Sequence, residues 1–478
     1  MERKTSTNGA SIRASLDHPI VDGDGHLVES LPVVREMIRE MSGSAVADRF
    51  FGSSPTYISR NAPLLPTSDV PPPRRSIPPW WALPTGSRDR ATSFLPHLLY
   101  ERLDDLGIDF AVLFPSLGLT VIGSADDELR VAACRALNRY AAELLDGLGD
   151  RLAAVATIPC HTPEEALAEL DHAVVELGFK SVMLNSYVRR LPGDGAEGEW
   201  FDLLALDSCF DYDPVWARCV ELGVAVTVHT PTMGLPLRAS PTRYMANHIG
   251  NFAASADAFA KALVFGGVMD RFPTLSVAFL ECGVSWGVQL LADLIGRWEK
   301  RGGSNILNLD PSRADFATWD ALVAQHGGST FADPTVRRAT FGQSDNPPAE
   351  LDDFRDSGID RVADIVDLFD RFYFGCEADD PTVHWAFADK VNPEGAQLRA
   401  MLGSDVGHWD VTDMDGVLHE AWELVEHGLL DAEQFRRFGC DNAIQLHGSM
   451  NPTFFDGTRV EQYARQLLAT GDDPAATG

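Results

Sequence analysis

Short apolar runs alternate with longer segments of helical periodicity along the whole chain. The runs are rich in β-branched residues and predict eight strands, at 19–26, 109–115, 151–159, 180–186, 224–230, 275–282, 371–377 and 398–405. The segments between them, such as 163–178, open with proline and acids and close on glycine, as helices do. Eight alternating units predict an α/β fold with a parallel sheet, closed into a (β/α)8 TIM barrel.

A doubly wound sheet is the alternative architecture. Such a sheet usually has fewer strands and a glycine-rich phosphate-binding turn after its first strand. The first turn here, within "DGDGHLVE", places an acid between its two glycines and lacks that fingerprint. The barrel is therefore favoured.

Two connections are too long for a plain barrel and predict insertions after strands 1 and 6, at about 31–100 and 303–366. The first contains "PPPRRSIPPWWALP", and a loop after a strand leaves the barrel at its C-terminal mouth. Trp80 and Trp81 are therefore expected to cap the site, although packing on the barrel wall is an alternative. The predicted organisation is a disordered N-terminal tail (1–18), a barrel (19–450) carrying both cap insertions, and a C-terminal extension (451–478).

Composition narrows the class of protein. The 478 residues are 45 % hydrophobic and 23 % charged, which is typical of a globular chain, and the net charge of -31 disfavours nucleic acid and membrane partners. Seven cysteines without CxxC spacing argue against disulfides and thiolate zinc sites and favour a reducing compartment. The first 18 residues lack an apolar signal segment, and no later run resembles a membrane span. These features predict a cytoplasmic location.

Five predicted strands end in an acid or an imidazole: Asp24 with His26, His229, Glu281, Glu377 and Asp405. The C-terminal ends of barrel strands meet at one rim, so these side chains are expected to converge there. Without an intervening lysine or arginine they would repel one another unless a cation neutralised them. Imidazole and carboxylate without thiolate predict one or two divalent ions, with Fe, Mn and Zn the candidates.

These motifs carry a resemblance to a known family. The stretches "DGDGHLVE", "FGGVMDRFPTLSVAFLECGVSW", "GSDVGHWD" and "CDNAIQLHG" follow one another as in the amidohydrolase superfamily. The sequence resembles its amidohydrolase-2 branch, which includes aminocarboxymuconate-semialdehyde decarboxylase and the resorcylate-type decarboxylases. The resemblance spans most of residues 19–448 and implies a metal-dependent barrel. It implies little about the substrate.

The resemblance also implies a ligand set. The family's first-strand HxH pair corresponds to Asp24 and His26, its strand-5 histidine to His229, and its strand-8 aspartate, which binds metal or moves protons, to Asp405. The strand-6 position, histidine in many members, is Glu281 here, which adds negative charge. Some members bridge two metals with a carboxylated lysine at the end of strand 4. Lys180 stands at the start of that strand instead, so a second ion would depend on Glu281 or Asp24.

Several further residues are candidates for supporting roles. His248 follows strand 5 in "MANHIGNF", where it could bind substrate, transfer protons or complete the shell of a second ion; an ordinary packing role is the alternative. His408, Glu29 and Glu377 are expected to orient the ligands by hydrogen bonds from outside the metal's own shell, and Asp22 could act likewise.

The favoured function is hydrolysis of an ester, thioester or amide of a small organic molecule, with Asp405 moving the proton. Non-oxidative decarboxylation of an aromatic or unsaturated carboxylic acid is the alternative, since the resembling branch contains many decarboxylases. A weaker resemblance to a non-haem di-iron thioesterase of terpenoid antibiotic biosynthesis suggests thioesters, including acyl-CoA. A non-catalytic barrel would have lost the ligand set. The expected partner is a small molecule, and the resemblance implies that a homodimer is an allowed assembly.

Overall fold

A computed structural model describes residues 9–50, 83–190, 200–229, 243–342 and 351–470 of the chain. Eight parallel strands form one sheet, in the order β1 (Val21–Leu27), β2 (Phe110–Pro115), β3 (Leu152–Thr157), β4 (Ser181–Leu184), β7 (Val226–Val228), β8 (Val277–Phe279), β9 (Phe372–Glu377) and β10 (Arg399–Gly403). Each overlaps a predicted strand. The predicted (β/α)8 barrel is confirmed.

The first and last strands close the barrel through backbone and side-chain contacts. The Asp405 amide donates to the Asp24 carbonyl over 2.9 Å, and the His26 amide donates to the Val406 carbonyl over 2.8 Å. Asp22 accepts a hydrogen bond of 2.9 Å from the amide of Ser404. The two chain segments that carry acids and imidazoles are therefore fixed against each other.

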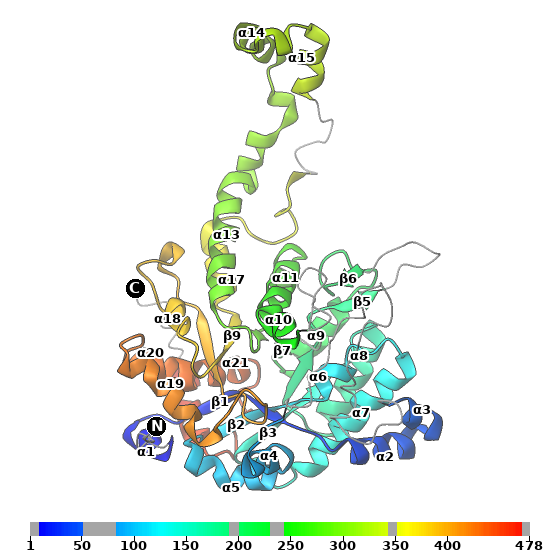
Figure 1. The fold of residues 1–478 in the computed structure, drawn as a ribbon, viewed down its shortest axis with the longest axis vertical. Coiled ribbons are helices and arrows are strands. Elements are labelled where there is room, and N and C mark those ends of the chain that lie inside the picture. The colour runs from blue at the N-terminus through cyan, green and yellow to red at the C-terminus, as the bar shows by residue number, and fades with distance from the viewer. Residues whose placement is uncertain (1–8, 51–82, 191–199, 230–242, 343–350, 471–478) are drawn as a thin grey trace.

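A ring of helices surrounds the strands (Figure 1): α5 (Pro96–Leu106), α7 (Asp127–Leu144), α8 (Pro163–Leu170), α9 (Asp213–Leu222), α11 (Asn251–Phe265), α13 (Ser285–Arg301), α17 (Val362–Phe369), α19 (Val417–Glu426) and α21 (Asn442–Met450). Local signals specify their starts. Asp126 caps α7 by accepting from the Leu129 amide, and Thr162 caps α8, where Pro163 fits the first turn. The helix α8 continues as a π-helical turn over Asp171–Glu176, which accounts for the predicted helix 163–178.

The barrel interior is filled by side chains that alternate inward along the strands. Val112, Met183, Ala278 and Met401 belong to one buried cluster with α21 and Phe455. The ring of Phe110 meets that of Phe455 at 5.4 Å between centroids. The predicted C-terminal extension thus packs against the N-terminal end of the barrel, and it continues into helix α22 (Glu461–Thr470).

Two local features differ from the sequence predictions. Residues predicted as part of a disordered tail form helix α1 (Gly9–Ser15), which packs on α5 and α19 and buries Ile12. A short antiparallel hairpin follows β4, made of β5 (Val188–Arg190) and β6 (Trp200–Asp202). Each is too short to produce a periodic signal, so tertiary contacts decide its structure.

Both insertions occur where the sequence predicted them. The first forms α2 (Leu31–Ser42), α3 (Ser44–Arg49) and α4 (Ser87–Phe94), and α2 packs against α7. Trp80 and Trp81, the proposed cap, lie outside the described residues.

The second insertion leaves the end of α13 and returns at α17. Figure 1 shows that it projects away from the barrel as an arm, with α14 (Phe316–His326) and α15 (Pro334–Phe341) at its tip. As a cap, this insertion was expected to fold over the barrel mouth. Its described part does not do so.

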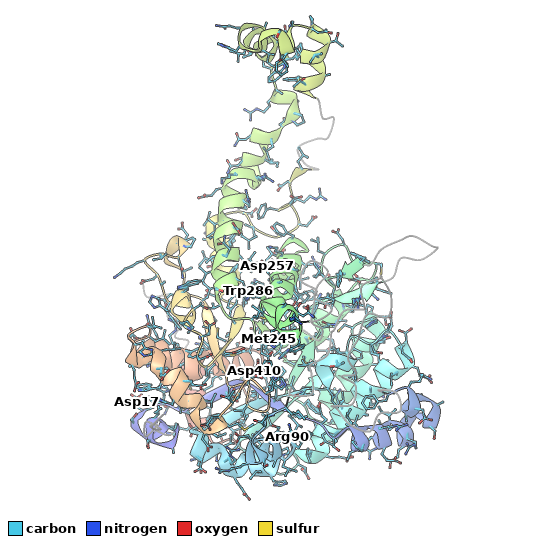
Figure 2. All side chains as sticks on the ribbon, viewed as in Figure 1. Asp17, Arg90, Met245, Asp257, Trp286 and Asp410 are labelled. Carbon is cyan, nitrogen blue, oxygen red and sulfur yellow. The ribbon has the colours of Figure 1, made fainter. Side chains whose placement is uncertain are left out.

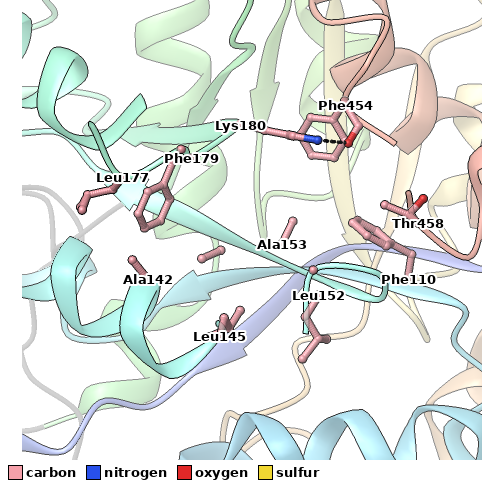
Figure 3. A pocket seen from close by; sticks show the side chains of 13 residues that line it. Phe110, Ala142, Leu145, Leu152, Ala153, Leu177, Phe179, Lys180, Phe454 and Thr458 are labelled. Carbon is pink, nitrogen blue, oxygen red and sulfur yellow. Dashed lines mark hydrogen bonds between the residues drawn. The ribbon is translucent and has the colours of Figure 1, made fainter. Parts of the chain in front are cut away.

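A cavity of about 250 Å³ opens where β2, β3 and β4 begin, at the end of the strands opposite the acidic residues. Figure 3 shows Lys180 at its edge, where the ammonium donates to the Phe454 carbonyl over 2.8 Å. Lys180 is therefore held away from the C-terminal rim, and the prediction that it bridges no metal is consistent with this position. Among the described helices, none is both long enough and apolar enough to cross a membrane.

Candidate metal centre

The ends of β1, β7, β8 and β10 bring together the residues that the sequence singled out. Two overlapping groups each place four potential ligand atoms within 4.8 Å of one another. The first group holds Asp24, His26, His229 and Glu281, and the second holds His26, Glu281, Asp405 and His408. His26 and Glu281 belong to both.

Glu281 is the centre of this cluster. Its Oε1 atom lies 3.0 Å from His26 Nε2, 3.3 Å from His229 Nε2 and 3.5 Å from His408 Nδ1. The backbone of Glu281 has a φ of 50°, and that of Asp405 has a φ of 49°, both in the left-handed region that non-glycine residues rarely adopt. Such strain persists where surrounding structure fixes it, and here both strained residues carry cluster carboxylates.

A β-bulge in β1 positions the first ligand pair. The pairing of β1 with β2 gains one residue between Asp22 and Gly25. Asp22 turns toward Ser404, whereas Asp24 and His26 both reach the cluster, with Asp24 Oδ1 3.6 Å from His26 Nε2. The bulge therefore separates the roles of two aspartates that stand two positions apart.

His408 lies deeper in the cluster than its predicted supporting role required. Its Nδ1 is 2.7 Å from Asp405 Oδ1, and its Nε2 is 2.9 Å from the hydroxyl of Ser116, at the end of β2. The ring stacks on that of His26 with 3.7 Å between centroids. His408 can thus either orient Asp405 or bind an ion itself.

The cluster is electrostatically unfavourable by itself. Burial, with Glu281 and Asp22 adding repulsion, raises the pKa of Asp24 well above its usual value; burial, with Asp410 and Glu281, does the same for Asp405. Burial opposes ionisation of Glu281 too, but the three imidazoles outweigh it and lower its pKa. Burial lowers the pKa of His26 to about 3. These carboxylates can all ionise together only beside a cation.

Unpartnered polar atoms indicate where a cation fits. Both ring nitrogens of His229 and Oδ1 of Asp24 are buried without a hydrogen-bond partner among the described residues. Burying such atoms unpaired costs about 1–3 kcal/mol each. Imidazole nitrogen and carboxylate oxygen are ligands for divalent transition metals. The donor set therefore fits a metal ion.

His248 stands apart from the cluster, at the end of α10 (Tyr244–His248). Its Nε2 lies 4.0 Å from Oδ2 of Asp410, and Asp410 interacts in turn with Asp405. Its ring meets that of Phe252 at 5.2 Å, and Phe252 meets His229 at 5.8 Å. The structure thus links His248 to the cluster by way of Asp410 on one side and Phe252 on the other.

The remaining predicted site residues occupy different positions. Glu29 accepts from the Leu117 amide over 2.9 Å, away from the ligand atoms, and burial raises its pKa to about 8. Glu377 keeps an exposed side chain at the rim, where desolvation and the charges of Glu281 and Asp410 raise its pKa to about 8. Neither residue belongs to the two groups of ligand atoms.

Asp410 and Ser116 were not predicted from the sequence. Ser116 directly follows β2, so its position at a polar strand end is the signal that marks it. Asp410 lies in the loop after β10, and nothing in the pattern of the strand marks it.

Gly407 supports the site through its backbone. Its φ is 118°, and a Cβ atom there would lie 2.6 Å from the His26 carbonyl oxygen. We expect Gly407→Ala to lower the free energy of unfolding by about 2–4 kcal/mol, because the backbone cost adds to a contact with the ligand strand. Urea unfolding at fixed metal concentration measures this loss.

Gly428→Ala is the matched control, since Gly428 has a φ of 69° and open space around its Cβ position. It is expected to cost about 1 kcal/mol, from the backbone conformation alone. Equal losses in the two variants would show that the approach to His26 contributes nothing.

An eight-stranded barrel with buried imidazoles and carboxylates at the C-terminal ends of its strands defines a class of metal-centre barrels. Comparison with known proteins places the chain within this class. The family model for amidohydrolases matches residues 78–448. The chain belongs to the amidohydrolase family of enzymes.

Curated relatives include the decarboxylase orsB of Emericella nidulans, 29 % identical over 186 residues, which make up 35 % of this chain and 50 % of the relative. A gamma-resorcylate decarboxylase of a Rhizobium species is 28 % identical over 188 residues, covering 38 % of this chain and 53 % of the relative. The chain thus matches about half the length of these relatives.

A solved structure of an amidohydrolase from Mycobacterium avium subsp. paratuberculosis K-10 superposes with a TM-score of 0.50 and 17 % identity. The match covers 91 % of this chain and all of that chain. At this identity, the likeness concerns the fold.

Proposed function

We propose that the protein is a metal-dependent non-oxidative decarboxylase of an aromatic or unsaturated carboxylic acid. The observation that carries this proposal is the buried cluster around Glu281, found in a chain whose curated relatives are named decarboxylases. These relatives favour decarboxylation over the hydrolysis that the sequence analysis preferred.

Aromatic side chains beside the cluster support a flat substrate. Phe114 and Phe252 each contact His229, with ring centroids 5.9 and 5.8 Å apart. Beyond Phe252, His248 contacts Tyr244 and Trp409 at 5.6 and 5.8 Å. Of these rings, His248 and Trp409 are only partly buried, so they are the ones able to contact a bound aromatic ring.

The ligand groups support one or two divalent ions, with Fe, Mn and Zn all compatible with mixed imidazole and carboxylate donors. When bound, such an ion neutralises the carboxylates and acts as a Lewis acid toward an oxygen of the substrate. If two ions bind, the Glu281 carboxylate, which belongs to both ligand groups and has two oxygens, would be the shared ligand, whereas His26 would bind one ion through Nε2.

The protein's own residues would handle the proton. Loss of CO2 breaks the bond between the substrate carbon and its carboxyl group and leaves the electron pair on that carbon, which must take up a proton. Asp405, which follows β10 at the cluster with its Oδ1 2.7 Å from His408 Nδ1, is our candidate donor. His248 beside Asp410 would return a proton toward Asp405 after each turnover.

Hydrolysis of an ester or thioester is the second candidate, and one observation favours it. Glu281 adds a third carboxylate to Asp24 and Asp405, and both ligand groups share it. A carboxylate shared between two ions is a feature of hydrolytic two-metal centres, and the added negative charge disfavours an anionic substrate.

A product assay separates the two candidates. We expect protein purified without chelator to contain at least about one equivalent of a transition metal and to release CO2 from members of a panel of hydroxylated aryl acids and unsaturated acids. Parallel reactions with acyl esters and acyl thioesters, monitored for free alcohol or thiol, are expected to give no product. Thiol or alcohol release without CO2 would replace the proposal by the hydrolase.

A further inference from the structure

The tip of the arm is a folded unit without a buried core. Every side chain in residues 307–342, which we call the distal arm, is exposed or only partly buried. Figure 2 shows the distal arm at the far end of the arm, with no other part of the described chain beside it. Leu322 and Val336 are 51 % and 42 % exposed.

Local sequence signals nevertheless define the starts of both helices of the distal arm, α14 and α15. Asp315 caps α14 by accepting from the amides of Ala317 and Thr318, and Asp333 caps α15, which begins with proline. The two helices contact each other: Phe341 lies 5.2 Å from Phe316 between ring centroids. Defined helix starts and a ring contact indicate a fixed shape.

Contacts within the distal arm do not account for its stability. Ordering one residue costs about 1–2 kcal/mol of backbone entropy, and the usual compensation is buried apolar surface. The base of the arm has such burial, since Ile306 is buried and Trp298 donates to the Ile359 carbonyl over 3.3 Å. The distal arm has only partial burial, where the rings of Phe316, Trp319 and Phe341 contact one another. Leu322 and Val336 stay exposed, and only a partner would bury them.

We propose that this partner is a second copy of the chain, with α14 and α15 of each copy packed against the same helices of the other. Two helical pairs joined in this way make a four-helix contact about a two-fold axis. A stable interface uses roughly 20–30 residues from each side. All 36 residues of 307–342 are at least partly exposed, which is enough residues for such an interface.

Charge favours a second copy with this geometry. The whole chain carries a net charge of -31, so two barrels repel each other. The distal arm is nearly neutral, with four aspartates, three arginines and no lysine or glutamate. Contact at the arm tips would keep the acidic barrels apart, and salt screens their repulsion over about 8–10 Å. Arm against arm is therefore the approach with the least repulsion.

Light scattering on the full chain during size-exclusion chromatography tests this proposal. The wild type is expected to have twice the mass of one chain. The double variant Leu322→Glu, Val336→Glu is expected to have the mass of one chain, with unchanged metal content and circular dichroism. Val175→Glu is the matched control, because Val175 is 61 % exposed on the helical ring, and it is expected to leave the dimer intact.

A mixing experiment tests the arrangement itself. A second double variant, Leu322→Lys, Val336→Lys, is expected to be monomeric alone and to form a dimer when mixed with the glutamate variant, because opposite charges meet only if arm contacts arm. A monomeric wild type, a dimeric glutamate variant, or a mixture that stays monomeric would each overturn the proposal. Flotation of the wild type with neutral phosphatidylcholine vesicles, lost in the glutamate variant, would overturn it in favour of a lipid surface.

Discussion

Replacing His229 with alanine is expected to abolish metal retention and to lower kcat/KM by about 10³-fold or more. His229 is fully buried, and both of its ring nitrogens lack a hydrogen-bond partner among the described residues. Its Nε2 faces the carboxylate of Glu281 at 3.3 Å. A nitrogen ligand at that point cannot be replaced by solvent without changing the ion's shell. Elemental analysis and turnover with the best acid of the substrate panel measure both effects.

The control for this variant is His447→Ala. His447 is also buried and stacks on Phe454 with 4.4 Å between centroids, but it lies at the opposite end of the barrel. Its loss is expected to reduce stability while leaving metal content unchanged. If His447→Ala removed the metal as fully as His229→Ala, general loss of structure would explain both, and His229 would not be a ligand.

Glu281→Gln is expected to have the second largest effect, a loss of about 10²–10⁴-fold in kcat/KM together with reduced metal content. A single oxygen of Glu281 faces the imidazoles of His26, His229 and His408. The amide keeps the shape of the side chain but removes the negative charge of the carboxylate that both ligand groups share. If two ions bind, the variant should retain fewer equivalents than the wild type.

Glu377→Gln serves as the control at the end of the neighbouring strand β9. Glu377 interacts with Glu281 through charge alone and lies outside the ligand groups. Its substitution is expected to change kcat/KM by less than about tenfold. Comparable losses in the two variants would mean that the negative charge of the rim, rather than ligation by Glu281, controls activity.

The main elements of the barrel could be predicted because their signal is local. Apolar runs of β-branched residues marked all eight strands, and prolines, acids and glycines marked ends of helices such as α7 and α8. Helix α1 and the hairpin of β5 and β6 were not predicted, because their few residues are ordered by tertiary contacts. The direction of the arm was not predicted for a different reason: a periodic pattern shows that helices form but not where they point.

The members of the site could be predicted in part. Asp24, His26, His229, Glu281 and Asp405 were singled out because they end strands whose C-terminal ends share one rim, and the structure brings them together. Asp410 was missed because it lies in the loop after β10, whose geometry the strand pattern does not specify. Ser116 was missed although it directly follows β2.

The sequence by itself determined the βα order, the acidic surface and the supply of imidazoles and carboxylates at strand ends. Only the tertiary structure decided that one oxygen of Glu281 faces three imidazoles, that Glu377 stays outside the cluster, and that the second insertion stands away from the barrel. The physical reason is distance: periodicity acts over a few residues, whereas these contacts join segments hundreds of positions apart and depend on the closure of β1 against β10.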